Sequence, residues 1–93
     1  MQLLWHPLAI ADRERIMAFI ARDKPSAALA LDEAFEAHAD LLSANPLLYR
    51  AGKVEGTREI VVHPNYIMVY RVEADTIVIL RVMHAAQMWP AAD

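Results

Sequence analysis

The sequence predicts a single α+β domain, in which an N-terminal strand and an antiparallel helical hairpin pack on a three- to four-stranded antiparallel sheet. The 93 residues make one domain (1–93), because a chain of this size supports one core. Apolar residues recur at helical spacing in the first half, and three runs rich in Val, Ile and Tyr follow in the second half. The 57% hydrophobic content, with 2 Gly and 5 Pro, indicates compact folding.

A short strand and a first helix open the predicted fold. Residues 3–5 form an apolar run, which ends at His6-Pro7 because proline cannot donate to a strand ladder but suits the first turn of a helix. In LAIADRERIMAFIARD, residues 12–15 form a stretch that we expect to be solvated. Three apolar residues then follow at i, i+3 and i+4 and are expected in the core: Ile16, Phe19 and Ile20.

A second helix is predicted over residues 26–43. Pro25 is acceptable only near the start of this helix, and the connection before it is so short that the two helices must run antiparallel. One stripe of the helix carries the residues that should face the sheet: Ala28, Leu31, Phe35, His38 and Leu42. The helix should end at Ser43-Ala44-Asn45-Pro46, where proline prevents its continuation.

Three strands should form a meander after a loop or short edge strand at 47–57. They cover 58–63, 66–73 and 76–83, and the links between them have hairpin length. The middle strand is apolar on both faces, with Met68 and Tyr70 on one face and Ile67 and Val69 on the other. Because the helices cover one face, the second needs a partner protein or a cover made by 47–57 and 85–93.

Composition excludes several function classes. Residues 1–40 carry four basic and seven acidic side chains, and residues 41–93 carry five of each, so the chain is not a general nucleic-acid binder. Its lack of cysteine fits a reducing cytoplasm, and it has neither a signal-like N-terminus nor an apolar run long enough for a bilayer. Without a Gly-rich phosphate loop or histidines at metal-ligand spacing, we expect no cofactor, no metal and no membrane partner.

Three segments resemble the RelE/ParE family of bacterial type II toxins. They are LLWHPLAIADRERIMAFIARDKPSAA, LLYRAGKVEGTREIVVHPNYIMVYRV and ILRVMHAAQMWP, which together span nearly the whole chain. The resemblance implies a cytoplasmic toxin that inhibits growth and is neutralised by a cognate antitoxin. Antitoxins of this type lay helices and strands over the toxin, and a hairpin with two apolar faces would supply such a surface.

The family divides between two activities. RelE-like members cleave mRNA on the ribosome with a set of basic residues, whereas ParE-like members poison DNA gyrase. In this chain the corresponding basic positions fall on Arg58, Ile60, Ile67 and Gln87, of which only the first is basic. Most of the clamp for a phosphate transition state is therefore missing. We expect inhibition of gyrase, with ribosome-dependent mRNA cleavage as the alternative and a binding module without toxicity as a third class.

Cleavage, if it occurs, would use His84 for proton transfer and Arg58 as the phosphate clamp, since an imidazole pKa of about 6.5 suits acid–base work. His63 and His38 are interpreted as structural. Five residues are predicted to bind a partner protein: Arg50, Lys53, Tyr66, Arg81 and Trp89. The basic side chains of the second half either gather at one sheet edge or form ordinary ion pairs with the interspersed glutamates.

Overall fold

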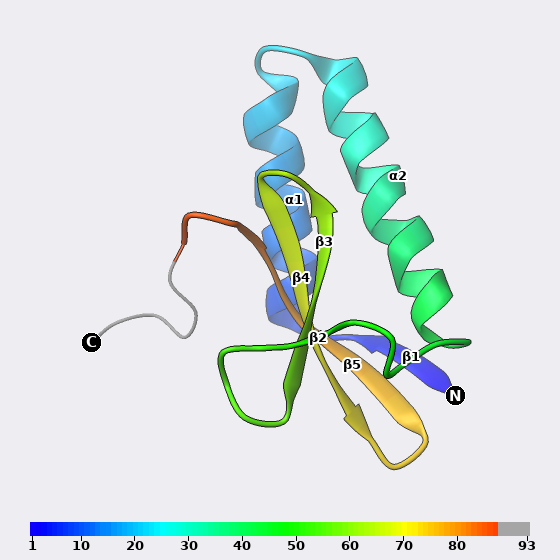
Figure 1. The fold of residues 1–93 in the computed structure, drawn as a ribbon. Coiled ribbons are helices and arrows are strands. Elements are labelled where there is room, and N and C mark those ends of the chain that lie inside the picture. The colour runs from blue at the N-terminus through cyan, green and yellow to red at the C-terminus, as the bar shows by residue number, and fades with distance from the viewer. Residues whose placement is uncertain (88–93) are drawn as a thin grey trace.

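A helical hairpin covers one face of a five-stranded sheet in the computed structural model, which describes residues 1–87 (Figure 1). The predicted α+β class and the order of its elements are confirmed. The elements are β1 (Gln2–Trp5), α1 (Pro7–Ala21), α2 (Pro25–Leu42), β2 (Arg50–Ala51), β3 (Thr57–His63), β4 (Tyr66–Glu73) and β5 (Thr76–His84).

The sheet has the strand order β1-β5-β4-β3-β2. Strands β3, β4 and β5 form the predicted antiparallel meander, with Ile60 opposite Met68 and Met68 opposite Val82. The predicted N-terminal strand and a short strand in the 47–57 segment form the two edges of this sheet. Strand β2 pairs antiparallel with the start of β3, and β1 pairs in parallel with β5, so the sheet is mixed and has five strands.

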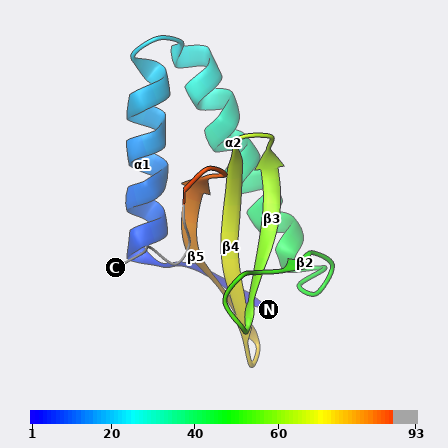
Figure 2. The same ribbon diagram turned by 60° about the vertical axis from the view of Figure 1, so that its left-hand side comes forward.

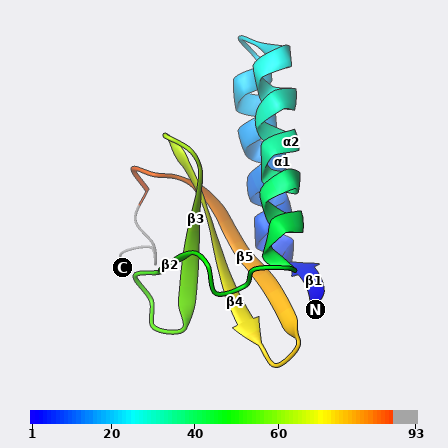
Figure 3. The same cartoon turned by 45° about the vertical axis from the view of Figure 1, so that its right-hand side comes forward.

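The two helices lie side by side (Figure 1) on one face of the sheet, and Figure 3 shows that they rise past the tip of the β3–β4 hairpin. Each begins with proline at its first position, and the Nδ1 atom of His6 accepts a hydrogen bond of 3.1 Å from the backbone N–H of Leu8. Phe19 is 67% exposed, so its predicted place in the core is wrong. The helical period is correct, but this turn of α1 extends beyond the sheet.

Phe35, Leu42, Ile60, Met68 and Tyr70 lie at the centre of the core. Each has at most 1% of its surface exposed, as expected for residues that face each other between the two layers. The stripe predicted on α2 is confirmed at its apolar positions, which are Ala28, Leu31, Phe35 and Leu42. His38 lies half-buried on the same helix, and its Nδ1 atom lies 2.8 Å from the carbonyl of Ala34, which supports the structural interpretation.

Asp12 is a buried residue of α1 and not part of a solvated stretch, so that prediction is wrong. Its side chain is 1% exposed and bridges the helix to β5. Oδ2 accepts hydrogen bonds from Arg81 Nε at 2.8 Å and from the backbone N–H of Val82 at 2.9 Å. Burial by itself raises the pKa of the Asp12 carboxyl, but the hydrogen bonds from Arg81, Val82 and Arg15 outweigh it and hold the pKa below its usual value.

Arg13, the next residue, joins the two helices and is also less solvated than predicted. Its guanidinium donates two hydrogen bonds of 2.9 Å to the carboxylate of Asp32 on α2 and a third to Glu36. The same group lies 4.5 Å from the ring centroid of Trp5, within the range of a cation–π contact. The helical hairpin is therefore held together by a planar, bidentate ion pair as well as by apolar packing.

Candidate functional site

The outer face of the sheet, defined here as the face turned away from the helices, carries a row of residues in register across four strands. Arg50 lies opposite Glu59, Glu59 opposite Val69, and Val69 opposite Arg81. Val69 is fully buried and Glu59 is 5% exposed, whereas Val61, two residues along β3, is 52% exposed. The second face is thus covered at its centre and open toward the β3–β4 tip.

Three of the five basic residues of the second half form separate ion pairs. Arg50 donates to Glu59 at 3.0 Å, Arg71 pairs with Glu73, and Arg81 pairs with Asp12. Of the two arrangements open from the sequence, ordinary ion pairing with the interspersed glutamates is therefore observed for Arg50 and Arg71, whereas Arg81 pairs with an acidic residue of α1. A guanidinium that already holds a carboxylate is poorly placed to stabilise an incoming phosphate as well.

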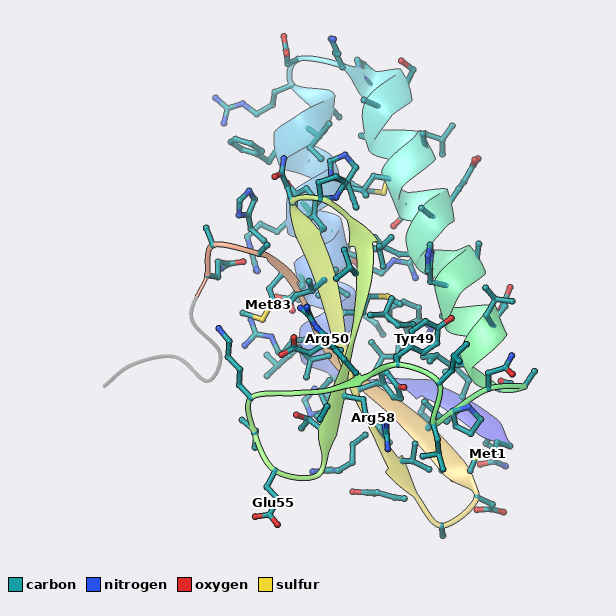
Figure 4. All side chains as sticks on the ribbon, viewed as in Figure 1. Met1, Tyr49, Arg50, Glu55, Arg58 and Met83 are labelled. Carbon is teal, nitrogen blue, oxygen red and sulfur yellow. The ribbon has the colours of Figure 1, made fainter. Side chains whose placement is uncertain are left out.

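Arg58, labelled in Figure 4, holds the loop that precedes β2. Its Nη1 atom donates to the carbonyls of Tyr49 at 2.7 Å and Leu47 at 3.3 Å. The hydroxyl of Tyr70 donates to the carbonyl of Pro46 at 2.8 Å, and the Tyr49 ring stands edge-on to that of Tyr70. Arg58 and Tyr70 together fasten the connection from α2 to β2 against the core.

The two residues predicted for catalysis lie near opposite ends of the sheet. Arg58 is opposite Tyr70 on β4, whereas His84 is opposite Tyr66 on the same strand. These two positions on β4 are four residue steps apart, which amounts to about 13 Å along the strand, and Arg58 and His84 also lie on different sides of β4. A single phosphodiester cannot be held by Arg58 and receive a proton from His84 in this arrangement.

His84 belongs to an aromatic row at the open end of the sheet. Its ring centroid lies 5.3 Å from that of Tyr66, and the ring of His63 lies 6.0 Å from Tyr66 on the other side. Nδ1 of His84 accepts from the backbone N–H of Ala86, and Nδ1 of His63 accepts from that of Asn65, both at 3.1 Å. These bonds place the proton of each neutral imidazole on Nε2, so neither ring offers a free basic nitrogen.

Two hollows flank Tyr66. The smaller, of about 260 Å³, lies between α1 and the end of β5 and is lined by Arg15, Ile16, Phe19, Tyr66, His84 and Gln87. The larger is an apolar cleft of about 530 Å³ between the helical hairpin and the β3–β4 tip. It is lined by Ile20, Ala27, Ala30, Leu31, Ala34, Val62, His63, Asn65 and Tyr66.

The structure places most of the predicted partner-binding residues without bringing them together. Arg50 lies on β2, and Lys53 follows in the exposed loop after it. Tyr66 lines both hollows, and Arg81 is held by Asp12. Trp89 lies outside the described residues. Sequence reasoning missed Asp12, although its position three residues after Ala9 and four before Ile16 marked it as part of the buried stripe.

Neither a metal site nor a membrane span is present in the described part of the chain. Within residues 1–87, no three His, Asp or Glu side chains gather as ligands for an ion. Over the same range, no helix combines the length and the apolar character needed to cross a bilayer.

The chain matches the family model described as ParE toxin of type II toxin-antitoxin system, parDE, over residues 3–89. It is 36% identical over 90 residues, 96% of this chain and 93% of the relative, to the Sinorhizobium fredii (strain NBRC 101917 / NGR234) protein named “Putative toxin Y4kP”. Its fold is similar to a structure of the chromosomal ParDE system from P. aeruginosa, with a TM-score of 0.81, 26% identity and coverage of 90% of this chain and 95% of that one.

More distant structures share the fold. The YoeB/ParE toxin from Agrobacterium tumefaciens has a TM-score of 0.67 at 16% identity, with 90% of this chain and 98% of that one covered. YafQ from E. coli has a TM-score of 0.68 at 16% identity, with 91% and 93% covered. The family match over nearly the whole chain and the two-layer fold lead to one conclusion: this chain belongs to the ParE toxin family of type II toxin-antitoxin systems.

Proposed function

We propose that this toxin inhibits DNA gyrase by binding to it and that a cognate antitoxin neutralises it in the cytoplasm. The ParE family model and the likeness to the P. aeruginosa ParDE structure support this branch of the family. Inhibition by binding requires a shaped surface and no catalytic group. It is therefore compatible with a chain in which Arg50, Arg58 and Arg81 are committed to internal contacts.

The distance between Arg58 and His84 carries the proposal. Cleavage of mRNA needs charge stabilisation and proton transfer at the same phosphate. The strand register separates the two best candidates by about 13 Å along β4 alone. Arg58 is also occupied by the carbonyls of Leu47 and Tyr49, and Gln87 replaces a basic residue at the position implied by the family resemblance.

Ribosome-dependent mRNA cleavage remains the second candidate because of the hollow beside His84. Arg15, Tyr66 and His84 line it together, so one basic side chain and one imidazole do share a concave surface. Arg15 is 60% exposed, but it donates to Oδ1 of Asp12 at 2.7 Å. A nuclease built here would have to release Arg15 from Asp12 and His84 from the N–H of Ala86 before either could act.

The antitoxin is the partner expected from the family. We propose that it covers the open end of the sheet, where Tyr66 lies between the two hollows and Val61 is exposed. Arg50 on the outer face and Lys53 in the exposed loop after β2 are further candidate contacts, and Trp89 is a candidate anchor at the C-terminal end. Arg81 contributes only if its ion pair with Asp12 opens.

Induced expression in growing cells tests the proposal. A gyrase inhibitor should cause filamentation and a DNA-damage response while translation continues, whereas an mRNA nuclease should stop translation within minutes. Toxicity should survive in His84→Ala. It should also survive in a folded Arg58→Gln variant, because inhibition by binding does not require the charge at position 58. A translation block that His84→Ala abolishes would replace gyrase inhibition by mRNA cleavage.

A further inference from the structure

Strand β1 forms an outer edge of the sheet whose main-chain groups are open. Strands β5, β4, β3 and β2 follow one another across the sheet in Figure 2, and β1 lies beyond β5 at the other margin. The N–H of Gln2 donates to the carbonyl of Asp75, just before β5, at 3.0 Å. By the alternation along a strand, the main-chain groups of Leu3 and Trp5 therefore point away from β5. No strand of residues 1–87 lies on that side of β1.

Strand β1 lacks the features that usually prevent an edge strand from pairing. Further along β5, the N–H groups of Val82 and His84 are capped by side chains, Asp12 Oδ2 at 2.9 Å and Gln87 Oε1 at 2.8 Å. Residues 1–5 contain no charged side chain, and no proline interrupts them. Because charges, prolines and caps are what block strand addition, the outward groups of β1 are available to a further strand.

Leu4, in the middle of this edge, exposes an apolar side chain on the outer face of the sheet. Its neighbours Leu3 and Trp5 pack against the core, so by alternation Leu4 points to the opposite face. There it lies beside the half-buried Val78 of β5, and 52% of its surface is exposed. Covering Leu4 would remove apolar surface from water, which favours an apolar side chain opposite it.

The edge is complementary to itself when a second copy approaches in the antiparallel direction. With Leu4 on a two-fold axis, Leu3 of each copy forms a hydrogen-bonded pair with Trp5 of the other, which satisfies the outward N–H and C=O groups of both residues. The two Leu4 side chains then face each other, with their Cβ atoms about 4.5–5.5 Å apart. The register that satisfies the main chain thus also covers the exposed apolar side chain.

The residues that flank this centre are polar and also complementary. In the same register, Gln2 lies opposite His6 of the second copy. The Nδ1 atom of His6 accepts from the N–H of Leu8 at 3.1 Å, so the proton of the neutral ring is on Nε2. This Nε2–H is a donor for the amide oxygen of Gln2, and no like charges meet across the axis.

From these observations we infer that the toxin associates with a second copy of itself through β1, so that the two sheets join into one continuous sheet. The β1 strands lie at its centre, and the β2 strands lie at its two margins. The hollows beside Tyr66 stay open in this dimer. Strand β1 ends opposite Ile79, whereas Tyr66 pairs with His84, five residue steps further along β5. The inference does not depend on which target the toxin inhibits.

Self-association of the purified wild-type toxin is the first test. In sedimentation equilibrium, the mass should rise from that of one chain toward that of two as the concentration increases. Amide hydrogen exchange measured by NMR over the same range should slow at least about tenfold at Leu3 and Trp5. The amide of His6, which already donates to Ile79 at 2.8 Å, should change little and serves as the internal reference. A mass of one chain up to the solubility limit, or a dimer without this protection, would overturn the inference.

Opposite charges at position 4 test the two-fold axis itself. Leu4→Glu and Leu4→Lys each place like charges face to face, so each should weaken self-association at least about tenfold. An equal mixture of the two variants should form a heterodimer at least about tenfold tighter than either homodimer, because a carboxylate then faces an ammonium group. The matched control makes the same two changes at Leu29, which is 55% exposed on α2, and should leave association unchanged.

Three results of the charge exchange would overturn pairing through β1. The first is wild-type association of both Leu4 variants, and the second is no recovery of association when they are mixed. The third is loss of antitoxin binding in Leu4 variants that still associate normally, because it would assign this edge to the antitoxin instead of a second copy.

Discussion

Replacing Asp12 by alanine should be among the most destabilising single changes in this chain. The substitution removes a carboxylate that is 1% exposed and accepts four hydrogen bonds, two from Arg81 and one each from Arg15 and the N–H of Val82. The Arg81 side chain is 27% exposed and would be left without its partner. The N–H of Val82 would lose its acceptor at the point where β1 no longer covers β5.

The size of the loss can be worked out from these contacts. Removing one member of a buried ion pair costs about 3 to 5 kcal/mol, and the partial exposure of Arg81 favours the lower end. An orphaned backbone N–H adds about 1 kcal/mol or more. The pair with Arg15 adds little, because that side chain is 60% exposed. We therefore expect a loss of about 4 kcal/mol, against a total stability of about 5 to 14 kcal/mol for a domain of this length.

Urea unfolding followed by circular dichroism measures this loss. With a slope of about 1 to 2 kcal/mol per M, the midpoint of Asp12→Ala should fall by about 2 to 4 M, or the variant should be unfolded without urea. The matched control is Glu14→Ala, an exposed acidic residue on the same helix, which should change stability by less than about 0.5 kcal/mol. A loss below about 1 kcal/mol for Asp12→Ala would refute the bridge between α1 and β5.

The remaining predictions concern the core, acid stability and a turn. Phe35→Ala should cost about 3 to 5 kcal/mol in urea unfolding, whereas Phe19→Ala should cost less than about 1, because Phe35 is fully buried and Phe19 is 67% exposed. Because the pKa of Asp12 is lowered in the folded state, the ionised carboxylate stabilises the fold fully above a pH of about 4, and this contribution is lost as the pH falls further. In urea unfolding measured at several pH values, Asp12→Asn should therefore lose less stability on acidification than the wild type does. Ala74 has a φ of 51°, a backbone conformation that glycine adopts more readily than alanine. Ala74→Gly should therefore increase the free energy of unfolding by about 0.5 kcal/mol, which would appear as a slightly higher thermal midpoint.

The elements that follow from local patterns were predictable, and those that need distant partners were not. Periodicity and turn residues predicted both helices and the β3–β4–β5 meander near their observed bounds. The parallel pairing of β1 with β5 joins segments about 70 residues apart, which no local pattern indicates. Phe19 fits the helical stripe, but its exposure depends on where the sheet ends, and that is a tertiary property.

The candidate site was predictable in composition and not in geometry. The missing clamp could be read from Ile60, Ile67 and Gln87, but the role of Arg58 could not, because its acceptors are loop carbonyls that carry no side-chain signal. The histidines share a local motif that the sequence does contain. His6, His63 and His84 each accept at Nδ1 from the N–H two residues later, which fixes their tautomers by local backbone geometry.

Supercoiling of a relaxed plasmid by purified gyrase, with purified toxin added, measures the proposed inhibition of gyrase. We expect the toxin to block supercoiling or to stabilise gyrase–DNA cleavage complexes, and the cognate antitoxin to restore activity. Programmed ribosomes incubated with the same preparation should keep their mRNA intact. Unaffected gyrase together with ribosome-dependent cleavage that His84→Ala abolishes would contradict gyrase inhibition.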